Sequence, residues 1–288
     1  DPAVWRRRRA RGATAWSSEM PHRTLIDAAT LLAALAGSEP LVVLDCRFDL
    51  ADTDAGERAW RERHLPRAQY AHLDRDLAGA RTGHNGRHPL PALQAFAQRA
   101  GAWGIAPGVQ VVTYDDQGGP YAARAWWMLR WLGHEAAAVL DGGPAAFIAA
   151  GGQLVAAPPQ VQGRPPYPVH APAMPAIDAD ALLAALATTP IVDARAAERF
   201  RGDAEPLDPV AGHIPGARQR FFLDNLQADG RFKPPDMLRR EFAAYAAECF
   251  PAGRPFLEAA VALMHKIHGE FQFDPEATTV STPVLEVL

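Results

Sequence analysis

The chain has 288 residues, of which 48% are hydrophobic and 22% charged, and its formal net charge is −4. This length predicts two domains of roughly 100–200 residues each, with enough apolar side chains to form cores. The charge gives no reason to expect nucleic acid or an anionic membrane as a partner, and no apolar run approaches the ~20 residues of a membrane-spanning helix. The two cysteines, Cys46 and Cys249, make no disulfide framework, so we expect a cytoplasmic protein.

Four consecutive arginines stand at positions 6–9. Such a run is typical of nucleic-acid-binding arms and of twin-arginine export signals, but an export signal requires an apolar segment next, and the following residues are not apolar. We therefore interpret residues 1–22 as a disordered leader, with a natural start at Met20.

A first domain is predicted over residues 23–153 from alternating helical and strand-like patterns. Its opening elements follow one another with polar or turn-forming residues between them. They are a helix over 24–35, a buried strand over 41–45, a polar helix around 57–63, a loop rich in Gly, His and Pro over 81–91, and a helix over 93–100.

The central stretch of this domain, residues 111–147, has the pattern of a βαβ unit. Its β-branched run Val111–Tyr114 leads through turn formers into a helix over 121–133, and a second strand over 137–140 ends at Asp141-Gly142-Gly143. Such a crossover joins parallel strands, so the loop at Asp115 should lie at the carboxyl end of a parallel sheet, where α/β proteins keep their chemistry.

This stretch resembles the first, non-catalytic domain of tandem-domain rhodaneses, the thiosulfate and 3-mercaptopyruvate sulfurtransferases. The resemblance lies in the run YDDQGGPYAARAWWMLRWLGH followed by VLDGG. The family's catalytic domain has Cys as the first residue of this loop, and its other domain often has Asp; Asp115 stands at that position here. We expect the Asp115 carboxylate to accept N–H bonds from the loop and to cap the following helix.

The chain then repeats itself at an offset of about 149 residues. The run Ile191–Arg195 is similar to 44–47, the run Gly212–Ala217 is similar to His64-Leu65-Pro66, and Leu223-Asp224 is similar to Leu73-Asp74. Three matches at one period predict a duplicated domain. Between the copies, residues 154–176 form a linker that holds seven prolines over 158–175, and we expect it to run stiff and extended across the surface.

The second copy, residues 177–248, breaks off before its own active loop. The repeat places that loop near Leu263, where the chain has neither a Val-rich strand nor a Cys. The predicted fold is therefore α/β, with tandem rhodanese-like domains, parallel sheets covered by helices on both faces, and an incomplete second domain. We expect marginal stability for this second domain, because small cores bury proportionally less surface.

Cys249 has the Cys-x4-Arg spacing of short rhodanese loops with Arg254, and is the candidate nucleophile. Helix formers precede it instead of a strand, so a free thiol at a junction is the alternative. Cys46 ends a buried strand and is predicted to be a core residue.

By the resemblance, Arg195 and Arg199 match the two arginines that flank the donor pocket of the catalytic domain. Arg195 has a counterpart in Arg47 and could be structural, whereas Arg199 has Ala51 at the equivalent offset, which leaves donor binding or a solvated surface arginine. Asp193 is predicted to be a structural residue at the strand end.

Residues 249–288 form a foreign-looking helical and extended tail. Over 250–288 the chain resembles the segment that precedes the catalytic Cys of bacterial transglutaminase-like proteins, through its GRP, IH, EF, DP and TP spacing. His265 and His268 in this tail are spaced as a metal pair, but without a third ligand nearby they are interpreted as exposed helix residues.

The family resemblance implies a sulfurtransferase. Such an enzyme moves sulfane sulfur from thiosulfate or 3-mercaptopyruvate to a thiol or cyanide through a Cys persulfide, with no cofactor. The alternatives are a catalytically inactive rhodanese-like module that binds anions or proteins, and a Cys-dependent phosphatase that would need a strand-borne Cys. Because the expected nucleophile position has no sulfur, we expect little or no sulfur transfer from this chain.

Overall fold

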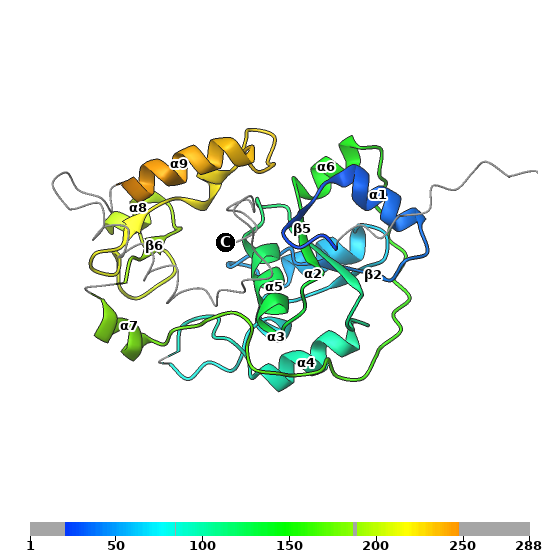
Figure 1. The fold of residues 1–288 in the computed structure, drawn as a ribbon, viewed down its shortest axis with the longest axis horizontal. Coiled ribbons are helices and arrows are strands. Elements are labelled where there is room, and N and C mark those ends of the chain that lie inside the picture. Colours follow the sequence, from blue (N-terminus) through cyan, green and yellow to red (C-terminus); the bar gives the residue numbers. More distant parts are fainter. Residues whose placement is uncertain (1–20, 84, 187–188, 248–288) are drawn as a thin grey trace, which may run out of the picture.

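The computed structural model describes residues 21–83, 85–186 and 189–247 (Figure 1). Its larger part is a five-stranded parallel sheet in the order β1-β5-β4-β2-β3. The strands are β1 (Leu25–Ile26), β2 (Leu41–Asp45), β3 (Ala68–Tyr70), β4 (Gln110–Tyr114) and β5 (Ala137–Leu140). The helices of this part are α1 (Ala28–Ala36), α2 (Ala55–Glu62), α3 (Leu73–Asp76), α4 (Leu93–Ala102), α5 (Pro120–Trp131) and α6 (Gly143–Ala149).

The sheet forms because its central strands are continuous apolar runs. Every residue of β2 and β5 is buried, as is typical of parallel strands that are covered on both faces. On one face the strands pack with Leu31 of α1 and Phe147 of α6, and on the other with Phe96 of α4 and Met128 of α5. The predicted parallel sheet with helices on both faces is confirmed for this part of the chain.

The opening of the chain differs from the prediction in one respect. The pattern over 24–35 indicates a single helix, but Leu25 and Ile26 form β1, which pairs in parallel with β5 at Val139 and Leu140. The helix begins afterwards, because the Asp27 carboxylate accepts the N–H of Thr30 and caps it. A two-residue strand is too short for its periodicity to be distinguished from helical spacing.

The linker lies against the first part of the chain. The Arg164 N–H donates to the Gly101 carbonyl at 2.8 Å, and the Tyr167 N–H donates to the Ala97 carbonyl at 2.9 Å, both on α4. The Tyr167 side chain is buried and joins the core on this face of the sheet. The linker is bonded along α4 and is not a free spacer.

The smaller part begins with α7 and contains a two-stranded parallel sheet. Its elements are α7 (Ala179–Ala185), β6 (Val192–Asp193), α8 (Ala197–Arg201), β7 (Arg218–Gln219), a 3-10 helix η1 (Phe222–Asn225) and α9 (Pro235–Ala247). In Figure 1 they lie to one side of the larger sheet, with α9 and α8 together and α7 below them.

The strands of the smaller part are less protected than those of the larger one. Val192 on β6 is 49% exposed, whereas Leu44 at the equivalent place on β2 is fully buried. In the larger sheet β2 has a neighbour on each side, β3 and β4, while the described residues give β6 the single neighbour β7. Little apolar surface is therefore removed from water around β6. No helix among the described residues is long and apolar enough to cross a membrane.

Candidate active site and donor subsite

The loop after β4 is a closed structure built around Asp115. Its carboxylate oxygen Oδ1 accepts the N–H groups of Gln117 and Gly119 at 2.9 and 2.8 Å, and Oδ2 accepts those of Tyr121 and Ala122, both at 2.9 Å. Gly119 has a φ of 97°, which turns the chain into α5, and Pro120 opens the helix. These are the contacts predicted for a capping Asp.

The Asp115 carboxylate occupies the position where these N–H groups could otherwise bind an external anion. Asp115 is 3% exposed, and burial raises the pKa of its carboxyl group, while the four N–H bonds act in the opposite direction. A carboxylate has no nucleophilic sulfur, and this one already accepts four N–H groups of the loop and of α5. In this arrangement Asp115 caps α5 and fixes the loop.

Cys46 is buried at the end of β2, in the core between the sheet and its helices. It is 1% exposed, and burial raises the pKa of its thiol well above the ordinary value, with the Asp45 and Asp115 charges adding to that effect. A thiol that resists ionisation is a poor nucleophile. Cys46 is a core residue, as its place in the sequence predicts.

Arg195 makes the contacts that Arg47 makes in the larger part. Each guanidinium forms a bidentate pair with the aspartate two residues earlier, Nη2 lying 2.6 Å from Asp45 Oδ2 in one case and from Asp193 Oδ2 in the other. The Arg195 hydrogen bonds hold the pKa of Asp193 below its usual value. The pairing fastens Arg195 to its own strand end.

The neighbourhood of these two pairs also repeats. The second contact of each guanidinium is a backbone carbonyl at 2.7 Å, that of Arg63 for Arg47 and that of Gly212 for Arg195. His64 Nδ1 lies 2.7 Å from the Trp60 carbonyl, and the ring of His213 makes the same contact with its own preceding helix. The sequence repeat is thus accompanied by a repeat of hydrogen bonds.

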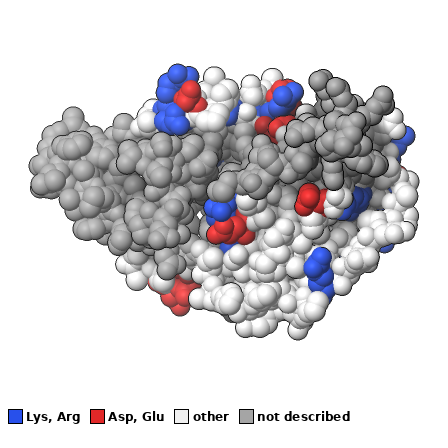
Figure 2. Space-filling view, turned by 45° about the vertical axis from the view of Figure 1, so that its right-hand side comes forward, with Lys and Arg blue, Asp and Glu red and all other residues white. Residues whose placement is uncertain are grey.

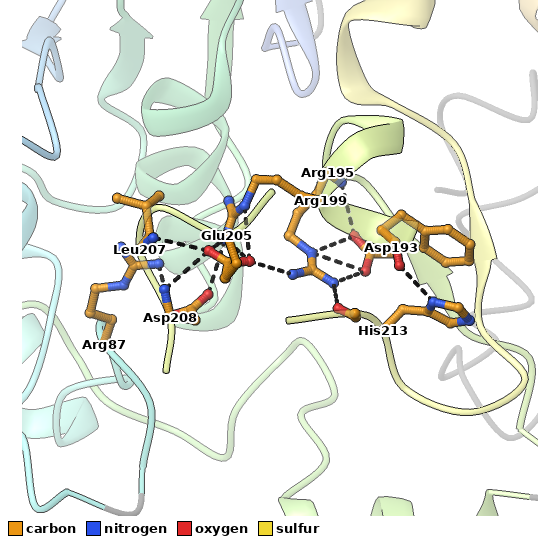
Figure 3. Close-up of polar contacts among 10 residues, drawn as sticks. Arg87, Asp193, Arg195, Arg199, Glu205, Leu207, Asp208 and His213 are labelled. Atoms are coloured by element: carbon orange, nitrogen blue, oxygen red, sulfur yellow. Dashed lines mark hydrogen bonds and ion pairs between the residues drawn. The ribbon is translucent and has the colours of Figure 1, made fainter. Parts of the chain in front are cut away.

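Arg199 has no counterpart of this kind and lies in a group of charged side chains contributed by both parts of the chain (Figure 3). Its Nη2 donates to Glu205 Oε1 at 2.7 Å and to Asp208 Oδ2 at 3.0 Å. Arg195 approaches the same glutamate at 3.4 Å, and Arg87, from the larger part, pairs with Asp208 at 3.1 Å. We call these five residues the arginine–carboxylate cluster.

Glu205 is the most enclosed carboxylate of the cluster. Its side chain is 4% exposed and also accepts the N–H groups of Leu207 and Asp208, both at 3.0 Å. The hydrogen bonds from Arg199 lower the pKa of Glu205 to about 2, so it stays ionised at neutral pH. Arg195 and Arg199 thus meet at Glu205, in a cluster with two residues, Asp208 and Arg87, that the sequence did not single out any more than Glu205 itself.

No sequence pattern indicated Glu205, Asp208 or Arg87 as members of a functional site. Glu205 and Asp208 lie in an irregular segment after α8, and Arg87 lies in the loop over 81–91, more than a hundred residues earlier. Cys249 and Arg254, the candidate nucleophile and its partner, lie outside the described residues, as do His265 and His268. Within the described ranges no group of three His, Cys, Asp or Glu side chains could hold a metal ion.

The parallel sheet, the loop at the end of β4 and the paired strand-end arginines are those of a rhodanese fold, and comparison with known proteins agrees. Residues 27–150 match the Rhodanese-like domain family. A probable 3-mercaptopyruvate sulfurtransferase of Pseudomonas aeruginosa is 48% identical over 235 residues, which cover 78% of this chain and 80% of that protein. The human 3-mercaptopyruvate sulfurtransferase is 35% identical over 233 residues, 76% of each chain.

Solved structures show the same fold. The 3-mercaptopyruvate sulfurtransferase of Leishmania major superposes with a TM-score of 0.67 at 28% identity, covering 80% of this chain and 64% of that one. The SseA protein of Escherichia coli superposes with a TM-score of 0.62 at 26% identity, covering 77% and 83%. The chain belongs to the rhodanese family. Within that family it is a sulfurtransferase by lineage.

The likeness of residues 250–288 to transglutaminase-like proteins stays a prediction. That segment lies outside the described residues, and the match to the Rhodanese-like domain family covers residues 27–150 only.

Proposed function

We propose that this chain binds a small anionic sulfur donor of the 3-mercaptopyruvate or thiosulfate type, and that it passes sulfur to a thiol or to cyanide slowly, because the usual nucleophile position has no sulfur. The observation that carries the proposal is the 48% identity to a probable 3-mercaptopyruvate sulfurtransferase over 78% of the chain. The relatives favour this function over a catalytically inactive binding module. The face in Figure 2 presents acidic and basic side chains in small mixed groups, which suits a small-molecule substrate better than a polyanion.

In the proposal Arg199 holds the donor. A carboxylate or a thiosulfate oxygen matches the forked N–H groups of a guanidinium, which bind such anions in pairs. Asp208 is the ligand of Arg199 that a donor would replace, because its side chain is 40% exposed whereas that of Glu205 is 4% exposed. Arg195 supports the site from its strand end, and its bonds to Asp193 keep it in place.

Sulfur transfer requires a thiolate that accepts sulfur from the donor, holds it as a persulfide and releases it to the acceptor. Asp115 has no sulfur and the Cys46 thiol is buried, so Cys249 is the nucleophile that we propose for any transfer by this chain. The reaction as proposed uses no cofactor, and we place it in the cytoplasm.

The proposed organisation is tandem. Residues 23–153 form one rhodanese-like domain, 154–176 the linker, and 177–248 a second, reduced rhodanese-like domain that carries the donor subsite. The repeated hydrogen bonds of Arg47 and Arg195 support this division.

The first test separates the nucleophile from the other thiol. We expect thiosulfate:cyanide and 3-mercaptopyruvate:cyanide assays on the purified chain to show little or no turnover, with any turnover lost in Cys249→Ser and kept in Cys46→Ser. Robust turnover that survives both substitutions would show that neither thiol carries the reaction and would contradict the proposal.

The second test measures donor binding, which does not depend on turnover. Arg199→Ala should weaken thiosulfate binding at least tenfold in calorimetry, because a charge-assisted pair is worth roughly 1.5–3 kcal/mol. Arg201→Ala is the matched control, since Arg201 lies on the same helix, is exposed and pairs with Asp203. Equal binding by the two variants would remove Arg199 from the donor subsite.

A further inference from the structure

The two loops at the carboxyl ends of β4 and β5 present a surface that is rich in glycine. Gly118 and Gly119 lie in the first loop and Gly142 in the second, and all three have positive φ values, of 88°, 97° and 76°. Asp141 stands at the edge of this surface and its carboxyl group is half-buried. Backbone of this kind lets another segment approach closely.

A segment of the smaller part lies on that surface. Residues 226–232 form a short hairpin, in which Leu226 and Phe232 make an antiparallel bridge and the Gln227 N–H donates to the Arg231 carbonyl at 2.7 Å. The hairpin continues from η1, and the Lys233 N–H donates to the Asn225 carbonyl at 2.9 Å, which ties both ends of the turn together.

The contact between loops and hairpin is close at three points. A Cβ on Gly118 would lie 2.6 Å from Leu226 Cδ1 and 3.0 Å from Leu223 Cδ2. A Cβ on Gly142 would lie 2.9 Å from Arg231 Cγ. At the third point the Phe232 N–H donates to Asp141 Oδ1 at 2.8 Å, across 91 residues of sequence.

A cavity remains between the two sides. It has a volume of about 150 Å³ and is lined by both loops and by Asp229, Gly230 and Phe232 of the hairpin. Asp115, which occupies the expected nucleophile position, is on its wall but directs its carboxylate to its own loop. The loop face is therefore occupied by protein of the same chain.

We propose that the glycine surface of the β4 and β5 loops is the docking platform that positions the smaller part of the chain, through the 226–232 hairpin. The smaller part buries few of its apolar side chains, so its own core gives it little independent stability.

The hairpin is joined to α9, because Lys233 and Arg220 both pair with Glu241. Arg220 directly follows β7, and β7 pairs with β6. Docking of the hairpin therefore also fixes the end of β6, after which Arg195 and Arg199 follow in the chain. The pair between Arg87 and Asp208 is a second contact across the same boundary.

The test uses two neighbouring glycines with similar backbone conformation and different surroundings. Gly118 and Gly119 both have positive φ, so an alanine strains the backbone similarly at either position. Space around Gly119 is open, whereas a Cβ on Gly118 meets two leucines of the docked segment. We expect Gly118→Ala in the full chain to raise amide hydrogen exchange in peptides covering 226–233 about tenfold, while Gly119→Ala leaves it unchanged. Equal exchange of the hairpin in the two variants would overturn the proposal.

A second pair of variants covers the case in which Gly118→Ala does not fold. Asp141→Asn keeps an oxygen that can accept the Phe232 N–H, whereas Asp141→Ala removes it. The proposal expects faster exchange of the Phe232 amide in Asp141→Ala than in Asp141→Asn, and identical exchange in the two would contradict it.

Discussion

Asp115 is predicted to stabilise the larger part of the chain by serving as the acceptor for four backbone N–H groups. In Asp115→Ala these four donors lose their partner at the start of α5. Each lost hydrogen bond costs about 1 kcal/mol net, and a buried donor left unpaired costs about 1–3 kcal/mol. Burying the carboxylate has its own cost, as its raised pKa indicates, and this cost offsets part of the stabilisation by the four bonds. We therefore expect Asp115→Ala to lower the free energy of unfolding by about 3 kcal/mol in total.

The measurement is urea unfolding followed by tryptophan fluorescence. Five of the seven tryptophans (Trp60, Trp103, Trp126, Trp127 and Trp131) lie in the larger part and none lies after residue 131, so the signal reports no unfolding of the smaller part. At a typical slope of about 1–3 kcal/mol per molar urea, a loss of 3 kcal/mol moves the midpoint by at least ~1 M. Asp115→Asn should lose about half as much, because its amide oxygen still accepts two N–H groups while its NH₂ group faces the others.

Asp116→Ala is the control for this prediction, since Asp116 is the exposed neighbour in the same loop. Surface substitutions of this kind typically change stability by less than ~0.5 kcal/mol. If Asp115→Ala shifted the midpoint no more than Asp116→Ala, the four N–H bonds would not hold the loop, and the account of Asp115 as a capping residue would be wrong.

Two further predictions concern pH and the linker. Arg199 lowers the pKa of Glu205 from 4.5 to about 2, so the stability that this pair contributes is complete above pH 4.5 and is lost as the pH falls towards 2. The protection of the α8 amides, corrected for the intrinsic pH dependence of exchange, should therefore fall less between pH 4.5 and 2 in Glu205→Gln than in the original chain, and an equal fall in the two would contradict this. A Cβ on Gly101 would lie 2.3 Å from a linker carbonyl oxygen, so Gly101→Ala should detach the linker and cost about 1–3 kcal/mol. Gly163→Ala is the matched control, because its Cβ would make only ordinary contact at 3.7 Å, and equal proteolysis of the linker in both would refute the prediction.

Much of the candidate site could be read from the sequence because its signals are local. Asp115 follows a β-branched run and precedes a helix, so its capping role depends on residues within seven positions of it. Cys46 ends a run of apolar residues, which identifies it as a core residue. The pairing of Asp193 with Arg195 is also local, two residues apart, and its repeat at Asp45 and Arg47 could be found by offset alone.

The sequence singled out only two of the five members of the arginine–carboxylate cluster, because the other three come close to these two only in the folded chain. Arg195 and Arg199 stand out through the family resemblance, but Glu205 and Asp208 belong to no helix or strand and have no periodicity. Arg87 reaches Asp208 across 121 residues, which no local pattern indicates.

The sequence by itself determined the α/β class, the parallel β2, β4 and β5, and the family, because burial in a covered sheet requires unbroken apolar runs and a crossover helix between them. Only the tertiary structure decided that Leu25 and Ile26 form an edge strand, since the partner strand lies more than a hundred residues away. It also decided that the linker is bonded along α4 and that the 226–232 hairpin rests on the glycine loops. In both cases an irregular segment without periodicity meets residues far away in the sequence. Its backbone N–H groups are chemically the same in every residue but proline, so no local pattern indicates which acceptor each one finds.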